Sequence, residues 1–260
     1  MLIPVAADAQ LRPLEPIPWR AFTERQPFSA QVGAAFLHEQ RASLAGTSGD
    51  LWEVGTFSLA WRTGRVVLEA AGTAQRFFRE RERFSEPHPD VREVSGDRRH
   101  DSGDYRISTS LSLTSNESPF RAALRFGTRL PTTDNGTGLD RDAIDFFATV
   151  GAHMPLGELV LSAEGGIGIH STREPTFEQD DLFLYAVSAE LRRFGFTPFA
   201  TILGQVHGTS HRELRGLEDL GELRVGVRAG EEVWIAVEAV RGYETFSPSS
   251  GIVVSIGARR

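Results

Sequence analysis

Apolar residues recur at every second position over long stretches of this chain, and this alternation most restricts how the chain can fold. In residues 105–114, the odd positions carry tyrosine, isoleucine, threonine and leucine, while the even ones carry arginine, serine and threonine. Residues 120–130 repeat the pattern, with three arginines on the polar side. Because side chains two residues apart share one face of a strand, the alternation predicts β-strands with one apolar and one polar face.

The same alternation predicts strands along most of the chain. We place them at residues 28–39, 50–62, 64–76, 105–114, 120–130, 144–154, 158–170, 183–192, 196–207, 221–229, 233–239 and 252–258. The second is the weakest, because Trp52, Phe57 and Trp61 do not share a face. A tilted strand needs roughly 9–11 residues to cross a bilayer, whereas strands of soluble proteins have about 5–6. These long strands predict an all-β fold, a transmembrane up-and-down antiparallel barrel of about 12 strands.

The expected connections alternate between short and long. The short ones, at 62–64, 116–119, 155–157, 193–195 and 230–231, contain the glycine, asparagine or proline typical of tight turns. The long ones fall at about 40–49, 77–103, 131–142, 171–181, 208–220 and 244–250. Outer-membrane barrels have tight periplasmic turns and long extracellular loops. We therefore expect a barrel in the bacterial outer membrane with both termini in the periplasm.

Composition excludes several other classes of protein. The chain has no cysteine and hence neither disulfides nor cysteine metal sites. Its net charge is −7 and it has no basic stripe, which argues against nucleic-acid binding. No segment reaches the roughly 18 consecutive apolar residues that a transmembrane helix needs. A membrane barrel also lacks such segments, because its strands alternate between apolar and polar residues.

Three regions are predicted along the chain. Residues 1–10 contain the small-residue pattern Ala7-Asp8-Ala9 and are interpreted as the remnant of an export signal. Residues 11–27 contain four prolines and are expected to form an extended periplasmic lead-in, followed by the barrel at 28–260. The strongly charged loop at 77–103 is either a solvated surface loop or a lid over the barrel mouth.

The polar strand faces are expected to line the interior of the barrel. The residues predicted to line this lumen are Arg106, Arg121, Arg125, Arg129, Asp145, Glu164, Glu190, Arg192 and Glu238. One interpretation is a ladder of ion pairs that fills the lumen of a structural barrel without transport. The other is a narrow channel or transporter whose arginines favour anionic or polar small solutes. A soluble ligand-binding β-barrel is a third alternative.

Catalytic and metal-binding readings have weaker support. His170, Ser171, His207, Ser210 and His211 could supply a hydrolase at the rim, but no flanking motif accompanies them. The oxygen-rich run 134–140 could hold calcium, although it departs from an EF-hand loop and also suits a simple turn. We expect no enzyme activity, no cofactor and no metal site.

One segment resembles a known family. The run Arg125-Phe126-Gly127-Thr128-Arg129-Leu130-Pro131-Thr132, with the residues that follow to about 170, resembles a family of bacterial outer-membrane β-barrels described as phenol-degradation-pathway transporters. The resemblance implies a 12-stranded barrel and transport of small hydrophobic or aromatic molecules. Expected partners are outer-membrane lipid, a small solute and the barrel-assembly machinery, and the barrel is expected to be a monomer. Barrels of this type commonly end in an aromatic residue, whereas this chain ends in Arg260.

Overall fold

The computed structural model describes residues 11–23, 27–115, 118–140, 142–174, 177–193, 195–208 and 217–260, with the backbone alone at 23, 135 and 172–180. The predicted export-signal remnant at 1–10 lies outside these residues. The elements are α1 (Trp19–Thr23), β1 (Phe28–Ala42), β2 (Thr47–Thr63), β3 (Val66–Arg83), β4 (Arg98–Asp101), β5 (Tyr105–Ser112), β6 (Arg121–Leu130), η1 (Asn135–Thr137), β7 (Asp145–Leu156), β8 (Leu159–Glu174), β9 (Phe177–Leu191), β10 (Phe196–His207), β11 (Leu220–Ala229), β12 (Val233–Gly242) and β13 (Ser250–Arg259).

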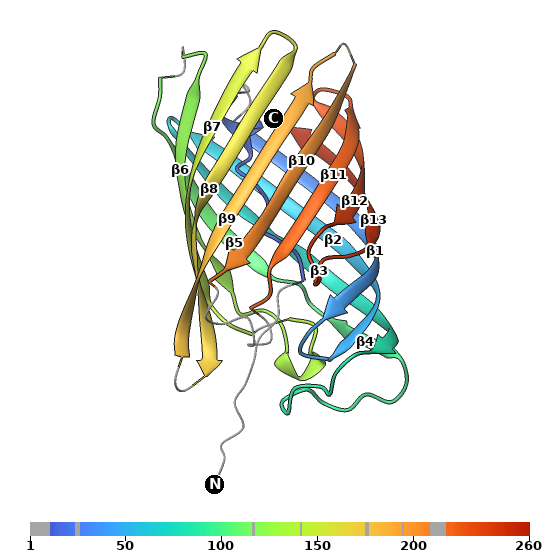
Figure 1. Cartoon of the computed structure of the whole chain (residues 1–260). Helices are drawn as coiled ribbons and strands as arrows, with labels where there is room; N and C mark the ends of the chain where they lie inside the picture. Colours follow the sequence, from blue (N-terminus) through green and yellow to red (C-terminus); the bar gives the residue numbers. More distant parts are fainter. Residues whose placement is uncertain are drawn as a thin grey trace.

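The strands form a closed barrel of 12 antiparallel strands, as the sequence predicts (Figure 1). Each strand pairs with its neighbours in chain order, and β1 pairs with both β2 and β13 to close the barrel. The short strand β4 extends the sheet at the far end of β3. Tight turns gather at one end of the barrel with Arg260, and the longer loops gather at the other. We call these the short-turn end and the long-loop end.

A β-bulge resolves the irregular pattern of β2. Opposite β1, Gly33 pairs with Thr56 and Ala34 with Val54, so Gly55 is an extra residue in β2. Its φ of 69° lies in the left-handed region that favours glycine. The inserted residue shifts the alternation by one position, so that Trp52 and Trp61 are both exposed on the outer face.

Two hairpins at the long-loop end are longer than predicted, and β3 likewise continues to Arg83 and pairs with β4 inside the predicted loop 77–103. β1 and β2 leave only a turn at residues 43–46, and β8 and β9 remain paired as far as Glu174 and Phe177. The sequence predicts loops at 40–49 and 171–181, because apolar alternation stops there. Backbone pairing continues beyond that point, since a ladder of hydrogen bonds does not require an apolar side-chain face.

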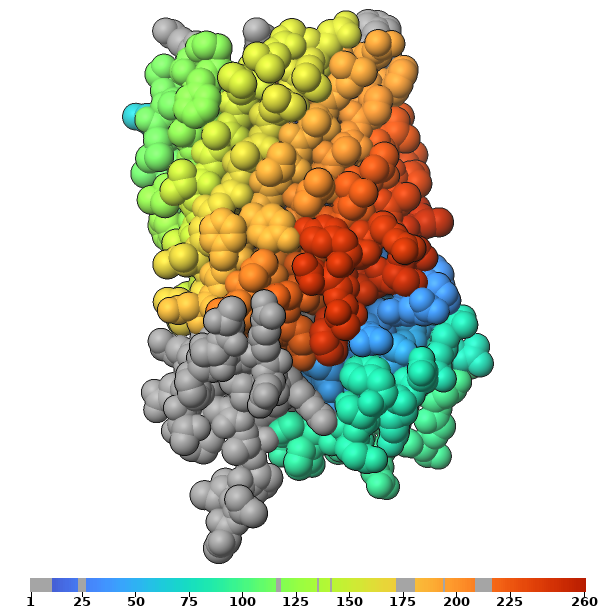
Figure 2. All heavy atoms as spheres, viewed as in Figure 1, coloured from blue at the N-terminus to red at the C-terminus, as the bar shows by residue number. Residues whose placement is uncertain are grey.

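Apolar side chains lie on the outside of this barrel and charged side chains on the inside, which is the reverse of a water-soluble barrel. Large apolar side chains such as Ile167, Phe146 and Val187 are more than half exposed on the outer face. Charged side chains such as Arg125, Arg129 and Glu164 are buried inside. Figure 2 shows part of the outer surface as a continuous wall from β6 to β13. Within the described residues, no helix is long and apolar enough to cross a bilayer.

Candidate functional site: the barrel lumen

The segment before β1 lies inside the barrel. Leu11 is buried among Leu37, Leu51 and Phe78 near the long-loop end. Ile17, Trp19 and Phe22 pack against Ala60, Val67 and Ala123 near the short-turn end. The segment therefore runs along the lumen before the chain turns into β1, and Figure 1 shows it in dark blue between the walls. The sequence predicts an extended periplasmic lead-in for residues 11–27. The structure places residues 11–23 inside the barrel, and we call these residues the plug segment.

Two ion-pair clusters hold the half of the plug segment that lies toward the long-loop end. Arg12 donates to both carboxylate oxygens of Glu222, at 3.0 and 2.8 Å, and to Glu53 at 3.3 Å. Both carboxylate oxygens of Glu15 accept from Arg224 Nη1 at 2.8 Å. Glu222 and Arg224 lie on β11, so this strand holds the segment through charges of both signs.

Backbone contacts and aromatic packing hold the other half. The Ile17 amide donates to Glu164 Oε2 at 2.6 Å, and the Trp19 ring stacks on His153 with 5.3 Å between centroids. The Phe22 carbonyl accepts hydrogen bonds from Arg62 and Arg121. Gly151 on β7 makes room for this packing. A Cβ atom there would lie 2.7 Å from the side chains of both Ile17 and Trp19.

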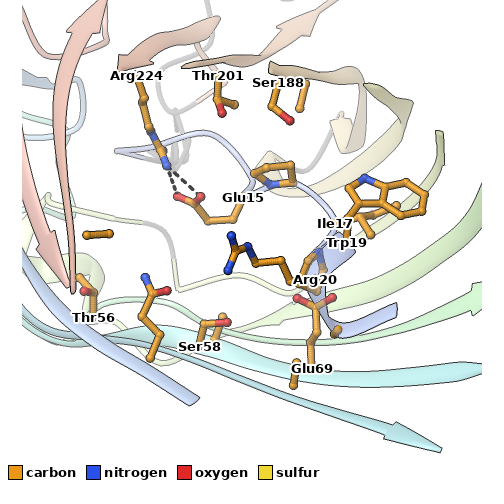
Figure 3. A pocket seen from close by; sticks show the side chains of 18 of the residues that line it. Glu15, Ile17, Trp19, Arg20, Thr56, Ser58, Glu69, Ser188, Thr201 and Arg224 are labelled. Carbon is orange, nitrogen blue, oxygen red and sulfur yellow. Dashed lines mark hydrogen bonds and ion pairs between the residues drawn. The ribbon is translucent and has the colours of Figure 1, made fainter. Parts of the chain in front are cut away.

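A cavity of about 360 Å³ remains beside the plug segment. Figure 3 shows Glu15 directed toward Arg224, with Thr56, Ser58 and Thr201 on the surrounding strands. Two charged groups on this lining, Arg106 of β5 and Glu238 of β12, form no hydrogen bond or ion pair with the described residues. The plug segment thus narrows the lumen, and the remaining space is lined by both charged and apolar side chains.

The structure places the residues predicted for the lumen on the inner side of the wall, in different roles. Arg125 Nε lies 3.2 Å from Glu69, and Arg125 Nη1 donates to the Glu15 carbonyl at 2.7 Å. Glu164 accepts from Thr149 as well as from the plug segment. Glu190 pairs with Arg228 at 3.1 Å. Arg121 contacts the plug segment, and Arg129 and Asp145 belong to a buried cluster near the long-loop end. The other three residues line the cavity; they are Arg106, Arg192 and Glu238.

Arg129 is the centre of a buried cluster of carboxylates near the long-loop end. Its Nη1 lies 3.0 Å from Asp104 and 3.1 Å from Asp140, and its Nε lies 2.7 Å from Asp145. Arg76 adds a second guanidinium that pairs with Asp140. Burial, and then the like charge of Asp104, raise the pKa of the loop residue Asp140 above its ordinary value. The cluster ties the 131–144 loop to the barrel wall.

Sequence reasoning missed the plug segment and its partners. Its signal is a three-residue period in the proline-rich stretch, where Leu11, Leu14 and Ile17 are apolar and Arg12 and Glu15 are charged. An extended polyproline helix has three residues per turn, so this spacing would place the apolar side chains on one edge. Glu53 and Glu222 could not have been singled out, because their roles depend on Arg12.

The candidate hydrolase and calcium residues have other contacts. His170 and His207 lie 3.4 Å apart between ring nitrogens inside the barrel, while the Ser171 hydroxyl donates to the Ile144 carbonyl. Ser210 and His211 lie outside the described residues. In the oxygen-rich run, Asp134 pairs with Arg92, whose hydrogen bond lowers the pKa of the carboxyl. In the part of the chain described, no three histidine or acidic side chains are placed to hold a metal ion.

Comparison with known proteins supports the fold. No family model and no curated protein sequence matches the chain. The COG4313 outer-membrane channel from Pseudomonas putida F1 superposes with a TM-score of 0.62 and 12% identity, over 94% of this chain and 99% of that one. The CymD monoaromatic hydrocarbon channel covers 98% of this chain and 95% of its own, with 10% identity and a TM-score of only 0.45. At this identity, the likeness to the first channel establishes a shared barrel architecture.

Proposed function

We propose that this protein is an outer-membrane channel for small solutes, which pass beside the plug segment rather than through an open pore. The observation that carries the proposal is a cavity lined with charged side chains inside a barrel whose outer face is apolar. Long loops would face the cell exterior, and Arg260 at the short-turn end would face the periplasm. The barrel architecture shared with the COG4313 outer-membrane channel agrees with this proposal.

The apolar outer face is the support for a location in the membrane. A soluble barrel would hide such residues in a core, yet they are exposed around the wall. Ile167 is 60% exposed near the middle of β8. We expect Ile167→Arg to cost about 2–4 kcal/mol of folding free energy in lipid vesicles, because the charge would enter hydrocarbon. Urea titration of the vesicle-folded protein measures this cost. A cost as small as that of the control Ile167→Leu would contradict contact with lipid.

Arg106 and Glu238 provide a matched test of solute passage. Arg125 is a poor choice because it already pairs with Glu69 and Glu164. Removing the Arg106 charge with Arg106→Ser should shift ion selectivity toward cations by at least about twofold, and Glu238→Ser should shift it toward anions. The reversal potential under a salt gradient measures both changes. Equal selectivity in the two variants would contradict a path along this cavity.

The contacts of the plug segment favour a second candidate, a structural barrel without transport. Its charged side chains are paired with the wall, and the apolar ones are buried. Single-channel recording distinguishes the two candidates. A channel gives resolvable steps of current at low voltage, whereas the structural barrel gives none. Cell fractionation and heat-modifiable gel mobility test the location separately.

The resemblance to phenol-pathway transporters bears on the solute. Small hydrophobic or aromatic molecules and small anions are both proposed. The cavity wall carries eight arginines and seven carboxylates together with serine and threonine, and it therefore favours small charged solutes over hydrophobic ones. Liposome swelling with benzoate and with its uncharged amide compares the two classes, and faster entry of benzoate is expected.

A further inference from the structure

Aromatic side chains form a row on the outer face of β1–β4 near the long-loop end. Phe36 lies opposite Trp52, Trp52 opposite Phe77, and Phe77 opposite His100. The three apolar rings are exposed, and those of Phe36 and Trp52 lie 5.2 Å apart between centroids. Because aromatic residues gather at the interfaces of membrane barrels, this row marks one edge of the apolar belt.

Arginines occupy the positions just beyond this row. Arg79, Arg81 and Arg83 alternate along β3 after Phe77, and Arg98 of β4 lies opposite Arg79. Their side chains are 53% to 83% exposed. A strand rises roughly 3.3 Å per residue, so Arg79 lies about 7 Å along β3 from the aromatic row, toward the long-loop end. We call these four residues the arginine rim cluster; teal and blue atoms mark this region at the lower rim of Figure 2.

Each arginine of the cluster has a carboxylate within 4.0 Å, and two of these four pairs are as long as 3.9 Å. Asp97 lies 2.9 Å from Arg79 and 3.9 Å from Arg98. Asp50 accepts from Arg81 at 2.6 Å and also contacts His38 at 2.8 Å. Glu80 lies 3.9 Å from Arg83, but it also accepts a hydrogen bond from the buried Arg99. Glu39 lies 3.7 Å from His38. Ion pairs as exposed as Arg79–Asp97 contribute little, so a phosphate can compete for these guanidinium groups.

Among the side chains that the structure describes, exposed arginines cluster at this rim on one side of the barrel, over β3 and β4. On the opposite wall, exposed residues near the same rim include Ile144, Asp181 and Val206. A general attraction between the barrel rim and anionic headgroups would not require the arginines to lie together on one wall. On this wall several arginines lie next to the aromatic row, on its side toward the long-loop end. This arrangement suits a single ligand whose acyl chains lie on the aromatic row and whose phosphate groups reach the arginines.

We propose that the arginine rim cluster binds the phosphate groups of a phosphorylated glycolipid of the lipid A type in the outer leaflet. The acyl chains would lie over Phe36, Trp52 and Phe77, and the phosphates would accept forked hydrogen bonds from Arg79, Arg81 and Arg83. This inference rests on the proposed outer-membrane location with the long-loop end outside. It assigns the wall of the barrel a ligand that does not enter the lumen.

Native mass spectrometry of the detergent-purified protein tests the proposal. The probes are bis-phosphorylated lipid A, the same lipid without phosphates, and phosphatidylglycerol. We expect lipid A to bind most tightly and the triple variant Arg79→Ser, Arg81→Ser, Arg83→Ser to bind it at least about tenfold more weakly. The matched control Arg65→Ser, Arg193→Ser, Arg260→Ser removes three exposed arginines at the short-turn end and should change binding by less than about twofold.

Several results would overturn the proposal: equal binding by the triple variant, equal loss in the control, or equal binding of the lipid without phosphates or of phosphatidylglycerol. Heat-modifiable mobility verifies that each variant folds, and the double variant Arg83→Ser, Arg98→Ser replaces the triple one should that fail to fold. Fractionation of the unaltered protein outside the outer membrane would refute the proposed function instead. Recovery in the outer membrane with unselective lipid binding would refute this inference alone.

Discussion

Deleting residues 11–23 should raise the single-channel conductance at least about threefold, because the interior of a 12-stranded barrel is wider than the filled interior of an eight-stranded one. The deletion removes the apolar side chains of Leu11, Ile17 and Trp19 from the lumen. It also exposes Glu222 and Arg224, which are buried against the plug segment in the intact protein. Planar-bilayer recording at fixed salt measures the change.

A graded variant and a control make this result specific. Arg12→Gln weakens the contacts with Glu222 and Glu53 and should give intermittent openings to the larger conductance. Arg193→Gln removes an exposed arginine outside the lumen and should leave the current unchanged. An unaltered conductance in the deletion variant, with normal heat-modifiable mobility, would show that another part of the chain limits the current.

Replacing Arg129 should cause the largest loss of stability. Arg129→Met leaves the buried carboxylates of Asp104, Asp140 and Asp145 without the guanidinium that lies between them. Removing one partner of a buried charge network typically costs about 3–5 kcal/mol. The urea dependence of tryptophan fluorescence for the vesicle-folded protein measures the free energy of unfolding.

Two further variants establish the cause of this loss. Arg241→Met removes an exposed arginine and should change the free energy by less than about 0.5 kcal/mol. Adding Asp104→Asn to Arg129→Met should restore part of the stability, because one buried negative charge disappears. A double variant that is no more stable than Arg129→Met would argue against uncompensated charge as the cause.

The barrel itself could be predicted from the sequence because its signal is local. In a membrane barrel every strand has one face toward each environment, so apolar residues at alternate positions, as in 120–130, reveal both the strand and its orientation. Arg125, Arg129 and Glu164 could be placed inside for the same reason. At Gly55 the alternation is a poorer guide, because one inserted residue moves the side chains that follow it to the opposite face of β2. The pairing of β2 with Gly33 and Ala34 is what identifies this insertion.

The state of the lumen was decided by tertiary structure alone. Arg12 and Glu222 are 210 positions apart, and nothing in the sequence near either residue specifies the other. A proline-rich stretch has the same composition whether it lies in solvent or inside a barrel, because its extended backbone requires no hydrogen-bonded partner. Closure of the sheet supplied what the sequence did not show: a charged interior that pairs with the chain's own N-terminal segment and leaves Arg106 and Glu238 facing the remaining space.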